Sequence, residues 1–175
     1  MINILEIKNT YFSYPDGTDA LQDINLSVKQ GEFLGILGGN GSGKTTLLKI
    51  LNGLLKTTKG EVYLEENNIK SINKDILFRK VCTCFQNPED QLFSSTVGED
   101  IAFGPTNMGL PKEEVKRRIN YALEAVEMVA FADKTIHNLS FGQKKRACLA
   151  GVLAMNPKVM LLDEPTSCLD PMGVN

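Results

Sequence analysis

The sequence predicts an α/β fold, in which an N-terminal antiparallel β region precedes a core of strands and helices and a helical insertion interrupts that core. Three observations predict this fold. Apolar residues alternate within residues 1–32, a short apolar run and a glycine-rich stretch precede helical spacing within 33–55, and a later apolar run ends in two acidic residues at 163–164.

Length and composition limit the classes of protein to consider. The 175 residues fit one domain, and 42% hydrophobic residues, 23% charged residues and a net charge of -2 are typical of a globular protein. A nucleic-acid binder would usually be more basic. No run approaches the roughly 20 apolar residues of a membrane-crossing helix, and the N-terminus lacks a signal-peptide layout. We therefore expect a cytosolic chain with no nucleic-acid partner.

The cysteines and the histidine do not suggest a metal site. Cys82, Cys84, Cys148 and Cys168 match neither the paired spacing of zinc ligands nor a secreted disulfide framework. We predict that they are small buried residues. The single histidine, His137, is expected to be structural.

The N-terminal half alternates strand and helix signals. Apolar alternation around Ile4–Ile7 and Ile24–Val28, with the turn residues Pro15–Gly17 between, predicts an antiparallel hairpin. Phe33–Leu37 is a short apolar run that predicts a strand buried on both faces, and the spacing within Thr45–Leu55 predicts a helix.

The middle of the chain is less regular. Alternation near Val62 and the run Val81–Phe85 predict two further strands. Pro88–Pro111 contains too many glycines and prolines for one regular element. Apolar residues then recur at helical spacing, which predicts a surface helix over Lys112–Ala130.

The last elements lead to a pair of acidic residues. Ser140 and Gln143 have the spacing of a capping box, which predicts a helix from there to about Met155. Val159–Leu162 is a continuous apolar run that predicts a buried strand. This strand would deliver Asp163 and Glu164 at its carboxyl end, where open α/β sheets bind ligands.

The glycine-rich stretch fits the phosphate-binding pattern G-x-x-x-x-G-K-[ST] and lies between a predicted strand and a predicted helix. Its glycines would let the backbone wrap a phosphate, Lys44 would reach the β- and γ-phosphates, and Thr45 would bind magnesium. A chance glycine turn would match in well under ~1% of such chains. The predicted nucleotide-binding residues are Gly38, Gly39, Asn40, Gly41, Ser42, Gly43, Lys44, Thr45 and Thr46.

The acidic pair supplies the second half of such a site. Asp163 would hold the magnesium ion or its water, and Glu164 would orient the attacking water or take its proton. An acidic pair after an apolar strand is by itself more often a solvated strand end. The phosphate-binding pattern upstream favours the functional interpretation.

Further segments carry a family resemblance. Leu139–Arg146 resembles the signature sequence of ABC ATPases, and Ser167–Asp170 resembles the loop that follows their acidic pair. Tyr14 matches the aromatic residue that stacks on adenine, and Gln86 matches the glutamine between the core and the helical subdomain. Over its whole length the chain resembles the ATP-binding subunits of ABC transporters.

The resemblance implies an ABC ATP-binding domain over residues 1–175, with a helical subdomain at about 88–139, that binds ATP and Mg²⁺ and hydrolyses ATP. Gln86 would hold magnesium or water beside the catalytic Lys44 and Glu164, although a polar residue at a strand end is commonly a cap. Tyr14 could equally be a packing residue. A partner's nucleotide would contact the signature residues Ser140, Gly142 and Gln143, so that ATP joins a head-to-tail homo- or heterodimer.

A narrower resemblance concerns Phe85–Phe93 and Thr96–Pro105, which look like the ATPase subunits of energy-coupling factor importers of vitamins and of metal ions such as cobalt and nickel. It implies that this stretch docks membrane-embedded transporter subunits, which would place the chain peripherally on the cytoplasmic face of the cell membrane. The alternative is an acidic surface loop.

The sequence also departs from the family. Phe141 and Cys168 replace usual glycines, so the Phe141 ring either points away from the nucleotide or marks a weaker site of an asymmetric pair. The family continues beyond Asn175 with a helix, a strand and a histidine that contacts the γ-phosphate. We therefore expect a C-terminally incomplete domain that binds ATP but hydrolyses it poorly. The alternatives are a soluble ABC ATPase of DNA repair or translation and a non-hydrolysing ATP-binding module.

Overall fold

The structure is a computed structural model that describes residues 3–165 of the chain. The chain divides into two compact units, Met1–Val81 and Cys82–Asn175. The helices and strands, in chain order, are β1 (Asn3–Ser13), β2 (Asp19–Lys29), α1 (Lys44–Leu51), β3 (Lys59–Leu64), β4 (Asn67–Asn68), α2 (Lys74–Lys80), β5 (Val81–Cys84), α3 (Val97–Asn107), α4 (Lys112–Ala125), α5 (Phe141–Met155) and β6 (Val159–Leu162).

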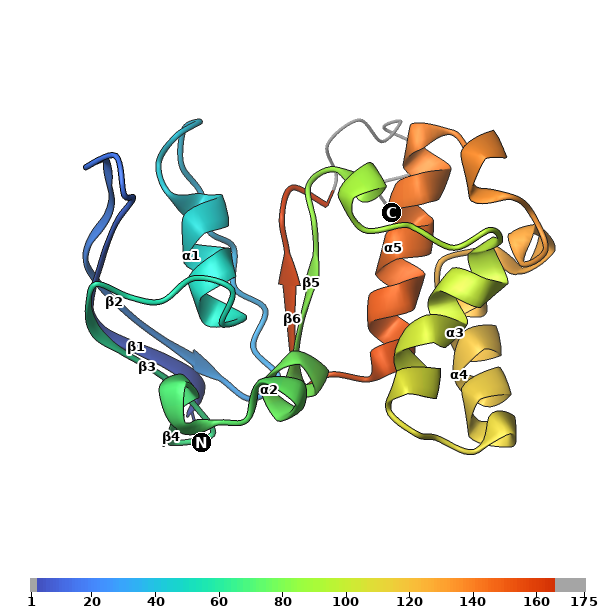
Figure 1. The fold of residues 1–175 in the computed structure, drawn as a ribbon, viewed down its shortest axis with the longest axis horizontal. Coiled ribbons are helices and arrows are strands. Elements are labelled where there is room, and N and C mark those ends of the chain that lie inside the picture. Colours follow the sequence, from blue (N-terminus) through green and yellow to red (C-terminus); the bar gives the residue numbers. More distant parts are fainter. Residues whose placement is uncertain (1–2, 166–175) are drawn as a thin grey trace. The chain divides into compact units, whose positions relative to one another are not determined.

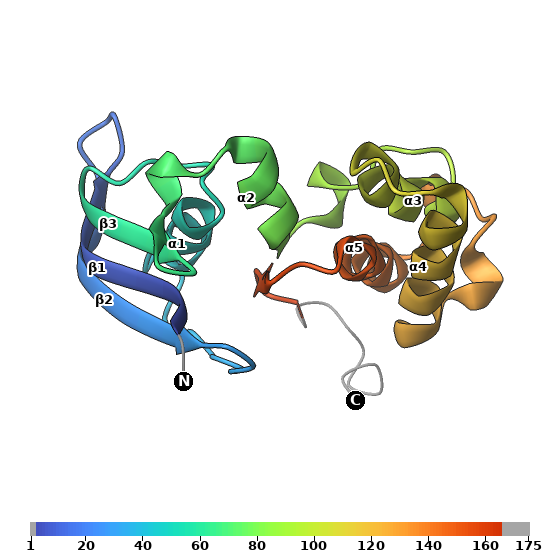
Figure 2. The same ribbon diagram turned by 90° about the horizontal axis from the view of Figure 1, so that it is seen from below.

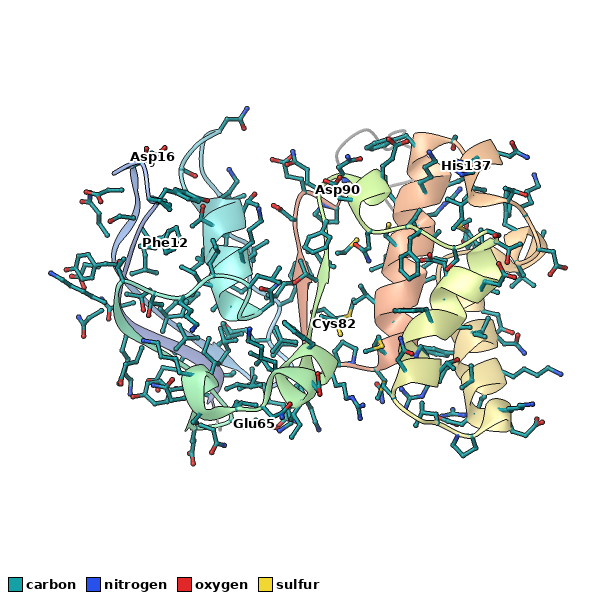
Figure 3. The ribbon with its side chains drawn as sticks, viewed as in Figure 1. Phe12, Asp16, Glu65, Cys82, Asp90 and His137 are labelled. Atoms are coloured by element: carbon teal, nitrogen blue, oxygen red, sulfur yellow. The ribbon has the colours of Figure 1, made fainter. Side chains whose placement is uncertain are left out.

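The first unit is built on an antiparallel sheet with the strand order β2-β1-β3-β4 (Figure 1). β1 pairs with β2 on one side and with β3 on the other, both antiparallel. Asp16 lies in the turn between β1 and β2, where its carboxylate accepts a hydrogen bond from the backbone N–H of Thr18 at 2.9 Å (Figure 3). The α/β class with an N-terminal antiparallel β region is therefore confirmed.

Helix α1 lies beside one face of this sheet (Figure 2). The inward side chains of β1 and β3, among them Leu5, Ile7 and Leu64, are buried, and so are Ile50 and Leu51 of α1. The helix ends earlier than Leu55, the residue predicted from its spacing, because Gly53 has a left-handed φ of +79°.

The predicted strand Phe33–Leu37 is wrong for this structure. The segment has no strand assignment, and Phe33 and Leu37 are 93% and 96% exposed. A strand forms only when its backbone N–H and C=O groups pair with a neighbour. Within residues 3–165, no strand pairs with this segment, so its apolar sequence does not form a ladder.

The second unit contains a two-stranded sheet of β5 and β6 and a group of three helices. Helices α3, α4 and α5 pack together around a core of fully buried side chains that includes Ile101, Met128 and Ala150. A smaller cluster of Cys82, Cys84, Cys148 and Val152 lies between β5 and α5. These three cysteines are buried, as predicted, and form no disulfide within the described residues, while Cys168 lies outside them.

The segment Pro88–Pro111, which was predicted to be too rich in glycine and proline for one regular element, contains two, the short 3-10 helix Pro88–Asp90 and helix α3. Helix α3 starts at a capping box formed by Thr96 and Glu99. The sequence analysis did not use this signal, because the segment is rich in glycine and proline. Gly104 lies against α5, where a Cβ atom would come within 2.2 Å of the Met155 sulfur. The glycine is thus a site of close helix packing and does not break the helix.

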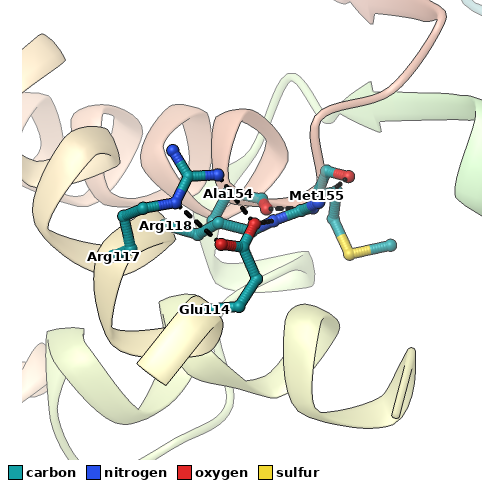
Figure 4. Close-up of polar contacts among 5 residues, drawn as sticks. All are labelled: Glu114, Arg117, Arg118, Ala154 and Met155. Carbon is teal, nitrogen blue, oxygen red and sulfur yellow. Dashed lines mark hydrogen bonds and ion pairs between the residues drawn. The ribbon is translucent and has the colours of Figure 1, made fainter. Parts of the chain in front are cut away.

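Helix α4 ends at Ala125, before the predicted end at Ala130, because Glu127 adopts a left-handed φ of +56°. Arg118 of α4 reaches the last turn of α5, where its Nη1 donates hydrogen bonds to the backbone oxygens of Ala154 and Met155, each at 3.1 Å (Figure 4). The same guanidinium pairs with Glu114, which also binds Arg117. The hydrogen bonds from Arg117 and Arg118 lower the pKa of the Glu114 carboxyl group to about 2.

His137 lies on the short 3-10 helix Ile136–Asn138 of the second unit and is exposed (Figure 3). Among residues 3–165, no helix has both the length and the apolar character that a membrane span requires.

Candidate functional site

The backbone of the glycine loop in the first unit fits a phosphate cradle. Gly41 and Gly43 have left-handed φ angles of +77° and +91°. A Cβ on Gly43 would lie 2.5 Å from the backbone oxygen of Ala20, and a Cβ on Gly38 would lie 2.7 Å from the Ser42 hydroxyl. The loop therefore has a shape that favours glycine, most strongly at Gly43, where a left-handed φ and a close backbone oxygen coincide, and its residues Gly38–Ser42 are exposed.

The residues that follow the loop converge on the same place. Lys44 curls back over the loop, where its Nζ donates hydrogen bonds to the backbone oxygens of Gly38 and Gly39, both at 2.9 Å. Helix α1 begins at Lys44, and the amides of a first helical turn lack intrahelical partners, which favours anion binding. The side chain of Thr45 offers the kind of oxygen that magnesium prefers.

The structure places Tyr14 beside this loop. Its hydroxyl and the Thr46 hydroxyl lie 2.8 Å apart and share a hydrogen bond. One edge of its ring packs against Phe12, with centroids 5.0 Å apart. The sequence predicted Tyr14 and Thr46 as nucleotide contacts, and the structure brings them together within the first unit.

In the second unit, the ends of β5 and β6 bring the other predicted residues together. The Asp163 N–H donates to the Cys84 oxygen at 3.0 Å, and Gln86 Nε2 donates to Glu164 Oε2 at 2.8 Å. Asp163 is buried, and Glu164 has a left-handed φ of +47°. A buried carboxylate at a strand end suits a magnesium ligand, and an amide-held carboxylate suits the positioning of water.

The signature residues form the predicted helix cap. The Gln143 N–H donates to the Ser140 hydroxyl at 3.3 Å, and the Ser140 N–H donates to Gln143 Oε1 at 3.0 Å. The capping box and the end of α5 at Met155 were both predicted correctly. Gly142 lies in the first turn of this helix.

Phe141 is the first residue of α5. The centroid of the ring is 5.9 Å from the Lys145 ammonium, and the side chain is 41% exposed. Lys145 was not predicted from the sequence, yet it is buried and donates a hydrogen bond to the backbone oxygen of Glu164. The only feature of the sequence that could have indicated this role is the position of the lysine, one turn after the start of the signature helix. The predicted loop Ser167–Asp170 lies outside the described residues.

Comparison with known proteins gives the family. Residues 21–167 match the family described as ABC transporter, which is most of the chain. The chain belongs to the ABC transporter family. This ABC chain is 54% identical over 174 residues to the energy-coupling factor transporter ATP-binding protein EcfA of Methanocaldococcus jannaschii, covering 98% of the chain and 62% of the relative. The EcfA protein of Methanosphaera stadtmanae is 52% identical over 177 residues, and the match covers 100% of this chain and 64% of the relative.

Solved ABC structures share the fold. The structure of cbiO1 from Clostridium perfringens, described as part of the ABC transporter complex cbiONQ, matches with a TM-score of 0.88 and 45% identity, over 99% of this chain and 70% of that one. A dimeric ATP-binding cassette in a post-hydrolysis state with ADP and Pi matches with a TM-score of 0.85 and 32% identity. This match covers 97% of this chain and 77% of that one.

These matches confirm the resemblance to ABC ATP-binding subunits and to energy-coupling factor ATPases. This ABC chain spans 58% to 64% of the length of the first curated relatives that it matches.

Proposed function

We propose that this chain is the ATP-binding part of an ABC importer of the energy-coupling factor type, which binds and hydrolyses Mg-ATP to power uptake. The glycine loop carries the proposal. Gly43 is held at φ +91° against Ala20, and the Lys44 ammonium lies over the loop, 2.9 Å from two of its backbone oxygens. This is the arrangement that a phosphate cradle requires. The names of the EcfA relatives and of cbiO1 support the transporter class.

The proposed mechanism assigns a task to each group. Lys44 and the loop amides stabilise negative charge on the transferring phosphoryl group. Thr45 of the first unit and Asp163 of the second would supply oxygen ligands to Mg²⁺, which would neutralise phosphate charge. Glu164 orients the attacking water and accepts its proton, while the Gln86 amide holds the carboxylate through the 2.8 Å hydrogen bond. Tyr14 offers an apolar face to the adenine base.

The proposed partners are a second ATPase subunit and membrane-embedded transporter subunits. Ser140, Gly142 and Gln143 lie at the exposed N-terminus of α5, which suits contact with a nucleotide held by the second subunit. Binding to the membrane subunits would keep the chain at the cytoplasmic face of the membrane.

An exposed aromatic pair supports docking of the membrane subunits. Phe93 and Phe103 are 65% and 50% exposed, and their rings pack edge to face with centroids 4.7 Å apart. Exposed aromatic clusters are typical of protein interfaces. Both residues lie in the segment that resembles energy-coupling factor ATPases. Cobalt or nickel is the proposed cargo, because the sequence resemblance includes importers of these ions.

A non-hydrolysing ATP-binding module is the second candidate. The observation that favours it is Phe141, since a bulky ring at the first residue of α5 changes how closely that backbone approaches a partner's γ-phosphate. A soluble ABC ATPase of DNA repair or translation would instead show an ATPase rate that nucleic acid stimulates.

The test measures ATP hydrolysis by this chain and by a version extended at its C-terminus to the length of its relatives, each alone and with the membrane subunits in detergent. We expect the extended version to hydrolyse ATP, the membrane subunits to stimulate it, and Glu164→Gln to leave only a small residual turnover while ATP still binds. If both versions bind ATP and neither hydrolyses it with the partner present, the chain is a binding module, and the roles of Glu164 and Gln86 are wrong.

A further inference from the structure

The main chain at Glu164 adopts a conformation that requires support. Its φ of +47° lies in the left-handed region, which residues other than glycine, asparagine and aspartate rarely adopt. Such backbone conformations persist only where the surrounding structure holds them, and they cluster at functional sites. The groups that hold this residue therefore bear on where its carboxylate lies.

Two side chains hold Glu164 from two directions. Gln86, after β5, donates from its amide to the carboxylate. Lys145, in the second turn of α5, donates from its ammonium to the backbone oxygen. The first contact orients the side chain, and the second fixes the peptide group from which that side chain projects.

The position of Lys145 is itself tightly defined. The residue is only 4% exposed, although lysine is almost never fully buried without a partner. The Phe141 ring flanks the ammonium on the same helix, with its centroid 5.9 Å away. An ammonium enclosed in this way makes strong, charge-assisted hydrogen bonds to a carbonyl oxygen.

The neighbouring contacts complete a short path from the signature helix to the acidic pair. Asp163, the residue before Glu164, is tied to β5 by its N–H bond to Cys84. Lys145 adds a tie from Glu164 to α5, whose first turn follows Ser140 and carries Gly142. A displacement of the start of α5 would thus act directly on the main chain of Glu164.

We propose that Lys145 is a positioning residue, which holds the main chain of Glu164 so that its carboxylate keeps the place needed for ATP hydrolysis. The proposal rests on the function proposed above. It makes the signature helix a support of the chain's own acidic pair, in addition to the nucleotide contact that the family resemblance implies.

The first test is kinetic, in the full-length protein with its membrane subunits. Lys145→Met keeps the length and apolar stem of the side chain but removes the donor, and we expect kcat to fall by about 10- to 100-fold. The KM for ATP and the Kd for ATP should change less than about two-fold, because no nucleotide contact is lost. Lys145→Arg keeps a cationic donor and should recover most of the rate. The matched control is Lys116→Met on the exposed surface of α4, which should leave the rate unchanged.

A second arm separates positioning from general damage. If Lys145 acts through Glu164, Lys145→Met should have almost no further effect on kcat in a Glu164→Gln background, since residues that act as a unit are not additive. An equal loss in both backgrounds, or a wild-type rate in Lys145→Met, would overturn the proposal.

The third arm does not depend on hydrolysis. Amide hydrogen exchange at Asp163 and Glu164 should be at least about ten-fold faster in Lys145→Met than in wild type, with the amides of α4 unchanged. If the wild-type protein proves inactive but this exchange is faster, the proposed function fails and the support of Glu164 by Lys145 stands. Unchanged exchange in the variant would remove that support even in an active enzyme.

Discussion

At the scale of single residues, the glycine loop contains two glycines that share a backbone conformation but differ in their surroundings. Gly41 and Gly43 both have left-handed φ angles. A Cβ on Gly41 would meet nothing within 4 Å, whereas a Cβ on Gly43 would lie 2.5 Å from the Ala20 oxygen and 2.9 Å from Leu21. Substitutions at Gly41 therefore report on the backbone conformation of the loop alone, whereas substitutions at Gly43 also report on its packing against β2.

The same substitution at these two positions should give different losses. Gly41→Ala should lower the free energy of unfolding by about 1 to 2 kcal/mol, the cost of a left-handed alanine. Gly43→Ala adds a clash with the Ala20 backbone oxygen, which costs a further ~1 to 3 kcal/mol, the usual cost of overpacking. Urea denaturation of the two variants measures the difference. Equal losses would mean that the loop does not rest on β2 as the structure shows.

The Lys145 contact shows why part of the site lay beyond sequence analysis. Motif spacing predicted the glycine loop, Asp163 and Glu164, because each motif is a local stretch of chain. Lys145 and Glu164 are 19 residues apart, and their hydrogen bond depends on how α5 packs beside β6. No local spacing encodes that contact.

At the scale of elements, predictions that rest on local sequence signals were correct, and those that depend on contacts between distant residues were wrong. Helix α5 was predictable at both ends, because a capping box joins residues only three apart and Asn156-Pro157 directly follows the last turn. In the structure, Asn156 ends the helix in a left-handed conformation. The strand at Phe33–Leu37 was not predictable, because strand formation depends on a partner that can lie far away in the sequence. Helix α3 was not predicted, because Gly104 counts against a helix in the sequence. The structure shows that this glycine allows close packing against Met155 of another helix.

The C-terminus of α5 gives an element-scale prediction. Arg118 binds two of the last carbonyl oxygens of α5 and its side chain is 17% exposed, whereas Arg117 pairs with Glu114 and its side chain is 72% exposed. Arg118→Gln should lower the free energy of unfolding by about 1 to 3 kcal/mol, because charged hydrogen bonds to a helix end are lost.

Arg117→Gln is the matched control for that change. It removes an exposed ion pair with the same glutamate, and such pairs contribute less than about 1 kcal/mol. Thermal or urea denaturation of both variants tests the comparison. A loss for Arg117→Gln as large as that for Arg118→Gln would show that Glu114 pairing, and not the carbonyl contacts, stabilises the helix pair.

At the scale of the whole molecule, folding stability depends on pH through groups that the fold has buried. Burial raises the pKa of Cys82 and Cys84 from 9.0 to about 11, since an apolar environment disfavours the thiolate. The nearby Lys145 lowers the pKa of Cys84, but by less than burial raises it. Between these two pH values the unfolded chain releases thiol protons that the folded chain keeps.

The sign of the effect follows from this difference in bound protons. The thiols contribute their full stability below pH 9, and this contribution is lost as the pH rises through the folded-state pKa of about 11. The free energy of unfolding should therefore fall more steeply from pH 9 to 11 in the wild-type chain than in a Cys82→Ala/Cys84→Ala variant. The variant starts lower because it leaves small cavities, so the slope, and not the absolute value, is the readout. Urea denaturation at about pH 8, 9, 10 and 11 measures both slopes, and parallel curves would mean that the two thiols titrate alike in the folded and unfolded chain.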